Sequence, residues 1–239
     1  MNFAQESVIY INKPYGMTSF GALAHVRYVL SRRLGLKRVK TGHAGTLDPL
    51  ATGVLVICTG RATKRIAEMQ GQTKEYEAVL QFGATTASYD REHTVNQTYP
   101  TAHITKQRVE DVLRRFVGDV EQVPPAYSAC KVNGLPAYAL MRQGQGVELK
   151  AKTLHIDSIE LTAFDKTKMT AGIRVVCGKG TYIRALARDI GEALDSGAFI
   201  TSLCRTRVGN VKVGDCVTLD DFPRWVEEKL KEEKTGNNI

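Results

Sequence analysis

Short apolar runs alternate with amphipathic stretches along the first quarter of the chain. Residues 8–11 form an apolar run that ends at the turn-forming residues 12–16, which predicts a strand followed by a turn. Thr18 or Ser19 can cap a helix whose apolar residues recur up to Leu30 and which we expect to end near Gly35. Residues 54–58 are continuously apolar and have the length of a buried strand.

The middle of the chain shows both the two-residue alternation of a strand and the apolar spacing of a helix. Residues 74–82 alternate, so that Tyr76, Ala78, Leu80 and Phe82 share one face of a predicted strand. Apolar spacing predicts a helix that Thr105 opens and Gly118 stops.

A second strand and helix are predicted further along, over residues 173–177 and 183–194. Residues 124–146 differ in kind, because they hold three prolines and three glycines, and they indicate an exposed loop or a small subdomain. The tail over residues 227–239 is mostly charged and is expected to form a solvated helix. Without repeats or a low-complexity linker, one mixed α+β domain is the simplest interpretation.

Composition narrows the class of protein. Of the 239 residues, 43% are hydrophobic, and none of the apolar stretches approaches the roughly 20 residues of a membrane span. Residues 1–6 do not look like a signal peptide, so we expect a cytoplasmic protein without a membrane anchor. The five cysteines are scattered without a CxxC pair, and the histidines have no ligand spacing, so neither a disulfide framework nor a metal site is expected.

The positive charge is concentrated near the start of the chain. Residues 7–67 contain ten lysines and arginines but one acid, Asp48. Such a segment suits the phosphates of a nucleic acid, although on charge alone a solvated basic face is at least as good an interpretation. The lone acid favours the first, because surrounding cations favour the ionised carboxylate that a nucleophile or base requires.

Asp48 lies in an unusual loop, Gly42-His43-Ala44-Gly45-Thr46-Leu47-Asp48-Pro49. The two glycines permit backbone conformations closed to other residues, and the proline restricts Asp48 to extended ones. By itself an Asp-Pro pair more often marks an ordinary turn before a strand. The cationic surroundings favour a loop that holds one carboxylate at the mouth of a groove.

Six segments in order resemble the motifs of the TruB family of tRNA pseudouridine synthases, over about residues 8–222. The segment 43–53, continued by 60–64, resembles the motif that carries the essential aspartate. The other five matching segments are Asn12-Lys13-Pro14-Tyr15-Gly16-Met17-Thr18-Ser19, Lys74-Glu75-Tyr76, Pro124-Pro125-Ala126-Tyr127-Ser128-Ala129-Cys130-Lys131, Cys177-Gly178-Lys179-Gly180-Thr181-Tyr182-Ile183-Arg184 and Leu203-Cys204-Arg205-Thr206-Arg207-Val208-Gly209.

The resemblance implies roles for particular residues. Asp48 is then the essential carboxylate, Tyr76 stacks on the target base, and Arg184 pairs with Asp48. Contacts with the substrate or its RNA are expected, from the motifs or from the basic segment, at His43, Lys64, Leu203, Lys13, Tyr182, Arg32 and Arg33. The reaction breaks the C1′–N1 bond of a uridine, rotates the uracil and forms a C1′–C5 bond. It needs no redox change, so no cofactor is expected.

The resemblance also implies the architecture and the partner. It predicts the α+β pseudouridine synthase fold, with a central, mixed, largely antiparallel sheet, flanking helices, an RNA-binding cleft and a thumb-like insertion at about 124–150. The catalytic domain is expected over 1–226, and too few residues follow Leu203 for the RNA-binding PUA domain of many bacterial relatives. The expected substrate is the T-arm of tRNA, at the uridine usually numbered 55, and the protein is expected to be a monomer.

Alternatives of other classes remain open from the sequence. An RNA-binding or tRNA-folding protein in which catalysis is secondary would also carry the positively charged segment. Asp48, Tyr76 and Arg184 argue against a purely binding role. A glycosidase-like enzyme needs a second carboxylate about 5–9.5 Å from the first, and no other acid occurs between Glu6 and Glu68. The sequence does not distinguish attack by Asp48 on the sugar, attack on C6, and removal of a sugar proton.

Overall fold

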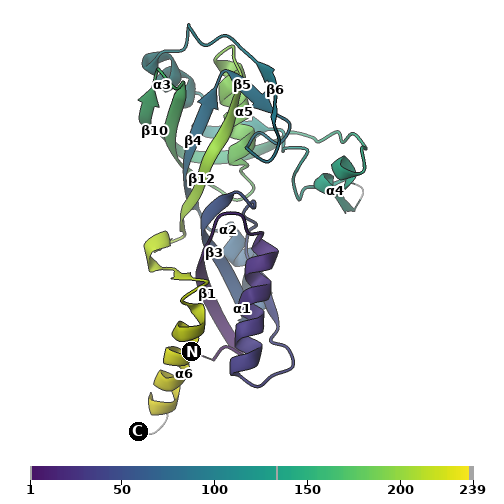
Figure 1. The fold of residues 1–239 in the computed structure, drawn as a ribbon, viewed down its shortest axis with the longest axis vertical. Helices are drawn as coiled ribbons and strands as arrows, with labels where there is room; N and C mark the ends of the chain where they lie inside the picture. Colours follow the sequence, from purple (N-terminus) through teal and green to yellow (C-terminus); the bar gives the residue numbers. More distant parts are fainter. Residues whose placement is uncertain (1, 133, 237–239) are drawn as a thin grey trace. The chain divides into compact units, whose positions relative to one another are not determined.

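The computed structural model describes residues 2–132 and 134–236, and Figure 1 follows them along the chain. The chain divides into two compact units, one built from residues 1–74 and 204–239 and the other from residues 75–203. The range 1–226 that we expected as one domain therefore includes all of the second unit and most of the first.

The first unit combines the N-terminal quarter of the chain with its C-terminal end. In strand order its sheet runs β14-β1-β3-β12, with β2 added to β3 and β13 added to β12. The strand β1 is antiparallel to β3 and parallel to β14. The elements are β1 (Glu6–Lys13), α1 (Ser19–Arg33), β2 (Thr41–His43), β3 (Ala51–Gly60), a 3₁₀ helix (Arg61–Arg65), α2 (Ile66–Gly71), the end of β12 (Ala198–Val208), β13 (Val211–Lys212), a second 3₁₀ helix (Val213–Asp215), β14 (Val217–Thr218) and α6 (Phe222–Gly236).

The helix α1 forms where the sequence predicts it. The Thr18 hydroxyl accepts a hydrogen bond from the Gly21 N–H at 2.9 Å and so caps the first turn. The chain leaves the helix at Leu34, and Gly35 follows with a φ of +63°, a conformation that favours glycine. One face of the helix is buried, through Ala22, Leu23, Val26, Val29 and Leu30.

The second unit is the contiguous middle of the chain. Its sheet runs β12-β4-β11-β10-β7, and β10 is antiparallel to both β11 and β7. The elements are β4 (Lys74–Phe82), β5 (Ala84–Thr86), β6 (Val95–Thr98), α3 (Lys106–Arg114), β7 (Gly118–Gln122), β8 (Lys131–Val132), β9 (Leu135–Pro136), α4 (Ala137–Arg142), β10 (Lys152–Asp165), β11 (Thr170–Cys177), α5 (Ile183–Ala193) and the start of β12. The expected α+β class with a large, mostly antiparallel sheet is confirmed.

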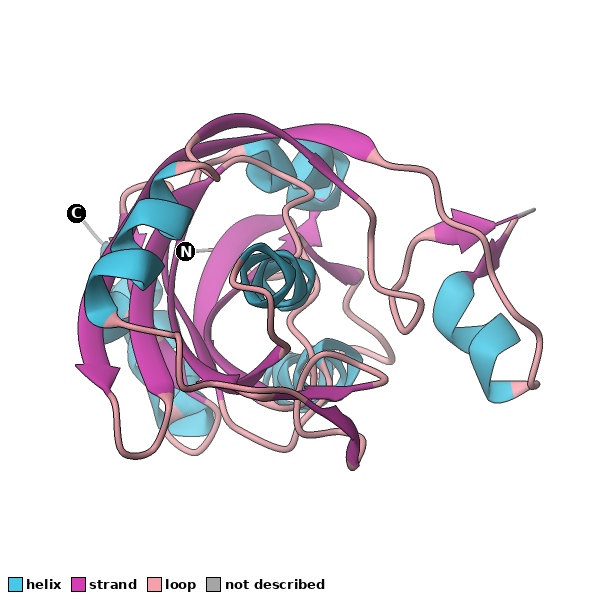
Figure 2. Cartoon of the chain, turned by 90° about the horizontal axis from the view of Figure 1, so that it is seen from above, coloured by secondary structure: helices cyan, strands magenta, loops and turns pink. Residues whose placement is uncertain are grey.

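Two details of the second unit differ from the sequence expectation or sharpen it. The helix α3 is capped by Thr105 as expected, but it ends at Arg114, and Gly118 instead opens β7 with a φ of +96°. The proline- and glycine-rich stretch contains β8, β9 and α4, so it is a small subdomain rather than a plain loop. Figures 1 and 2 both show α4 apart from the other helices of its unit.

The charged tail belongs to a longer helix than the sequence indicated. The helix α6 begins at Phe222, and Trp225 packs against the rings of Phe222 and Phe3, each at a centroid distance of 5.7 Å. It also reaches α1, because Arg33 and Glu227 form an ion pair at 2.6 Å. Residues 227–236 of the tail are therefore the outer part of a helix that is anchored to the first unit, and residues 237–239 lie outside the described residues.

Candidate active site

The loop that carries Asp48 is held by buried hydrogen bonds in the first unit. The Ser19 hydroxyl donates to the carbonyl oxygen of Leu47 at 2.9 Å and accepts from the Leu47 N–H at 2.8 Å. Leu47 itself is buried, and the Ala51 N–H donates to the Asp48 carbonyl oxygen at 3.1 Å. The main chain is thus fixed on both sides of Asp48, whose side chain is half-buried.

Lys13 is buried beside this loop. Its ammonium donates to the carbonyl oxygens of Pro14 at 2.8 Å and Met17 at 2.6 Å, and it reaches the Pro49 carbonyl oxygen at 3.4 Å. Burial lowers the pKa of Lys13 to about 8, while the nearby Asp48 carboxylate acts to raise it. We expected Lys13 to contact RNA; the structure instead places its ammonium among main-chain oxygens, so an RNA contact stays a prediction.

Arg205 is another buried cation of the first unit and is 1% exposed. Its guanidinium donates to the carbonyl oxygens of Val54 at 2.7 Å and Gly45 at 3.1 Å, so it ties β12 to β3 and to the Asp48 loop. Gly53 allows this approach, because a Cβ there would lie 2.2 Å from the Arg205 carbonyl oxygen. Sequence reasoning missed Arg205, although it stands two residues after Leu203 in one of the matching segments.

Arg184 is fixed in the second unit by groups from distant parts of the chain. Its guanidinium donates to the carbonyl oxygens of Ser88 and Tyr127, both at 3.0 Å, and lies 3.7 Å from the Asp90 carboxylate. Asp90 is held in turn by the Ser88 hydroxyl at 2.6 Å and the Glu92 N–H at 2.9 Å. Asp90 was not expected from the sequence, where it is one acid among many.

Tyr76, Leu203 and Tyr182 are the other expected site residues of the second unit. Tyr76 lies on β4 with an 8% exposed side chain, on the predicted buried face of that strand. Leu203 is half-buried on β12. Tyr182 precedes α5, and its N–H donates to the Gln122 side-chain oxygen at 2.9 Å. Asp48 belongs to the first unit and Arg184 to the second, so their pairing stays a prediction.

The expected RNA contacts of the first unit differ in exposure. Lys64, Arg32 and Arg33 are exposed, and Arg33 is paired with Glu227. His43 is half-buried on β2, and its Nδ1 is buried without a hydrogen-bond partner among the described residues. Burial, and to a lesser extent Arg205, lowers the pKa of His43. A neutral imidazole suits stacking or hydrogen bonding better than an ion pair with phosphate.

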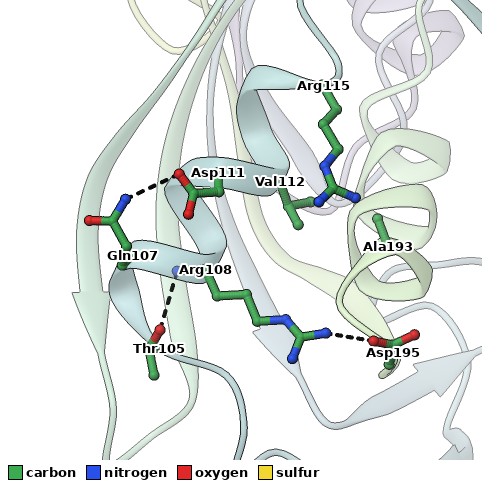
Figure 3. A pocket seen from close by; sticks show the side chains of 8 residues that line it. All are labelled: Thr105, Gln107, Arg108, Asp111, Val112, Arg115, Ala193 and Asp195. Atoms are coloured by element: carbon green, nitrogen blue, oxygen red, sulfur yellow. Dashed lines mark hydrogen bonds and ion pairs between the residues drawn. The ribbon is translucent and has the colours of Figure 1, made fainter.

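A pocket of about 480 Å³ lies elsewhere in the second unit, between α3 and the end of α5 (Figure 3). Arg108 crosses it to Asp195, with 2.5 Å between nitrogen and oxygen, and Gln107 donates to Asp111 at 3.1 Å. None of the residues that line it was predicted as a site residue, and its charged groups largely neutralise one another. It is therefore not the site that the motifs indicate.

Comparison with known proteins gives the family. Residues 32–183 match the family model described as TruB family pseudouridylate synthase (N terminal domain), and residues 184–236 match the one described as tRNA pseudouridylate synthase B C-terminal domain. Asp48, Tyr76, Arg184 and Arg205 fall within these two matches, whereas Lys13 and Ser19 precede the first of them. The chain belongs to the TruB family of pseudouridylate synthases.

Curated relatives match along the whole chain. The chain is 58% identical over 240 residues to the tRNA pseudouridine synthase B of Bacteroides thetaiotaomicron, covering 100% of each sequence. It is 42% identical over 230 residues to the protein of the same name from Flavobacterium johnsoniae, covering 96% of this chain and 98% of the relative.

Solved structures agree on the fold. A Cbf5-Nop10-Gar1 complex contains a chain with 27% identity and a TM-score of 0.68, over 95% of this chain and 57% of that one. An H/ACA RNP bound to a substrate RNA containing 2′-deoxyuridine matches with 26% identity and a TM-score of 0.63, over 93% of this chain and 55% of that one. The chain thus spans little more than half of those proteins, and the expected pseudouridine synthase fold is confirmed.

Proposed function

We propose that this protein converts a uridine in the T-loop of tRNA, at the position usually numbered 55, to pseudouridine, with Asp48 as the catalytic carboxylate. The observation that carries the proposal is the rigid support of Asp48. A loop rarely has a buried hydroxyl, here that of Ser19, bonded to the main chain of the residue before its carboxylate, together with two buried cations beside it. In a family of pseudouridylate synthases, that support favours a carboxylate that must be accurately placed.

The chemistry needs a carboxylate more than any other group. The C1′–N1 bond of the uridine breaks, the uracil turns, and C5 bonds to C1′ and gives up its proton. A fixed carboxylate can assist by adding to C1′, by adding to C6, or by accepting a sugar proton, and each route begins from Asp48. We assign to Tyr76 the stacking contact with the uracil, and to Arg184 the pairing with Asp48 through a guanidinium that the second unit already holds.

The uridine must leave the base stack before a carboxylate can reach it. Eversion costs a few kcal/mol, which stacking and phosphate contacts have to offset. We assign these contacts to His43, Lys64, Arg32 and Arg33, to Lys13 and Tyr182 where the motifs suggest them, and to Leu203 as an apolar contact. The lowered pKa of His43 supports its use as a neutral, stacking side chain.

We further propose that the protein acts as a monomer in the cytoplasm, where free thiols such as its five cysteines persist. Among the described residues, the structure has no helix long and apolar enough to cross a membrane.

The substitution Asp48→Asn tests the catalytic assignment. Asparagine keeps the shape of the side chain, so the loop should fold normally, but it is neither a strong base nor a carboxylate nucleophile. We expect no detectable pseudouridine in an unmodified tRNA transcript, while tRNA affinity persists or rises because a negative charge has left a basic segment. Chemical mapping of pseudouridine, filter binding and circular dichroism measure the three properties.

The matched control is Asp157→Asn, which removes one negative charge from an exposed strand position. It should convert uridine at the wild-type rate. Substantial conversion by a folded Asp48→Asn protein would overturn the assignment. Tight tRNA binding without any conversion by the unaltered protein would favour the alternative of an RNA-binding or tRNA-folding protein. A product at another uridine would leave the reaction standing and refute the position.

A further inference from the structure

Two large aromatic side chains of α1 are mostly exposed to solvent. Phe20 is 65% exposed and Tyr28 is 64% exposed, on the helix face opposite the buried residues. They stand eight residues apart, with Ala24 halfway between them and Arg32 four residues beyond. Residues at this spacing follow one stripe along a helix. We call Phe20, Ala24, Tyr28 and Arg32 the outer stripe of α1.

The charge around the outer stripe is of one sign. The sequence from Ser7 to Leu47 contains no acidic residue, and Arg27, Lys37 and Arg38 add to Arg32 at or beyond the C-terminal half of the helix. Within the first unit, the structure records an ion pair of α1 with Glu227, which takes Arg33. An apolar protein surface would leave these cations without partners, whereas a nucleic acid provides both flat bases and phosphates.

We propose that the outer stripe of α1 is an RNA contact in which Phe20 and Tyr28 stack on unpaired bases while Arg32 binds a neighbouring phosphate. This inference rests on the proposed function, because it takes tRNA as the polyanion. Eight residues of helix rise about 12 Å, which corresponds to three or four base-stacking steps of about 3.4 Å. Bases in a duplex offer no free face, so the contact selects a loop or another single-stranded segment of the RNA.

The test compares the tRNA affinity of the full-length protein with that of Phe20→Ala, Tyr28→Ala and the double variant. Loss of one stacking contact should weaken binding by about fivefold or more. The slope of log affinity against log salt should stay unchanged in these variants, whereas Arg32→Gln should reduce that slope by about 0.7–0.9. Phe20→Trp, which keeps a flat ring, should retain the affinity that Phe20→Leu loses.

Controls separate stacking from other effects. Leu36→Ala removes an exposed apolar side chain from the same basic segment and should leave affinity unchanged. The midpoint of thermal unfolding should stay constant in the aromatic variants, because the rings make little contact with the fold. A perfect RNA duplex of similar length should bind the wild type and the aromatic variants equally well.

Three outcomes would overturn the inference. Wild-type tRNA affinity in the double variant is one, and an equal loss of affinity for the duplex is another. The third is unchanged tRNA affinity together with loss of a dimer in analytical ultracentrifugation, which would make the stripe a contact between protein copies. Conversion of uridine by the unaltered protein is measured on the same tRNA, so failure of the proposed function would be seen separately.

Discussion

The hydroxyl of Ser19 supports the loop that carries Asp48. A single substitution, Ser19→Ala, removes this support. In Ser19→Ala the buried N–H and carbonyl oxygen of Leu47 both lose their partner. Ser19 is 2% exposed, so water cannot easily take the place of the hydroxyl. Each buried main-chain group left without a partner costs about 1–3 kcal/mol, and we expect the free energy of unfolding to fall by about 2–4 kcal/mol. For a protein of this size, that corresponds to a melting temperature lower by roughly 5–15 °C.

The same substitution should lower activity by loosening the residue next to Asp48. A misplacement of about 1 Å in a catalytic group can cost on the order of a hundredfold in rate, so we expect single-turnover conversion to slow at least about tenfold. The rate is measured at saturating protein and at a temperature where circular dichroism shows the variant fully folded. Affinity for tRNA should not change, because Ser19 is buried and cannot contact RNA.

The neighbouring Thr18→Ala is the matched control. It removes the N-cap of α1, which costs about 0.5–2 kcal/mol, but it leaves both hydrogen bonds between Ser19 and Leu47 in place. The control should therefore lose stability and keep its conversion rate. A Ser19→Ala protein with the melting temperature and conversion rate of the wild type would show that this hydroxyl does not hold the Asp48 loop.

Three further predictions follow from the buried and exposed cations. Arg184→Lys should lose most of the conversion rate despite its charge, because an ammonium cannot satisfy two carbonyl oxygens and Asp90 in one plane; near-wild-type turnover would remove Arg184 from the site. Lys13 has a folded-state pKa of about 8, below its ordinary value of 10.5, so the unfolded chain binds more protons between these pH values. Denaturant titrations should show wild-type stability rising across that window relative to Lys13→Met, and parallel curves would refute the shift. Arg32→Glu should weaken tRNA binding and reduce its salt dependence, while the melting temperature stays unchanged. Arg33→Glu should have the same effects on binding and should also destabilise the fold, because it breaks the ion pair with Glu227. Salt-independent tRNA binding by the wild type would contradict both expectations.

Local patterns predicted the elements whose environment is regular along the chain. The alternation around Tyr76 and the continuous apolar run of β3 correspond directly to the burial of those strands. The pattern over β10 gave no such signal, because half of its 14 residues are exposed, on both faces, and one is buried. Its position in the sheet depends on pairing with β7 and β11, which no local periodicity encodes.

The candidate site divides in the same way. Asp48 could be proposed from the sequence because the composition and charge of its loop are unusual within a few residues, and its catalytic role stays a prediction. Arg205 and Asp90 were not, since an arginine or an aspartate is normally exposed. The partners that bury Arg205, Val54 and Gly45, are 151 and 160 residues away in sequence. Asp90 likewise owes its burial to Arg184, which belongs to a helix much later in the chain.

The first unit is built from both ends of the chain, and this affects how it can fold during synthesis on the ribosome. Residues 75–203 emerge without interruption and can fold as soon as they are complete, whereas residues 1–74 lack β12, β14 and α6 until the last segment appears. At a synthesis rate of about 5–20 residues per second, Arg205 is made roughly 8–30 s after Asp48. During that interval the basic N-terminal segment is outside the ribosome before its fold can close. A chain that stalls before Cys204 therefore carries the aspartate without the arginine that fixes its loop.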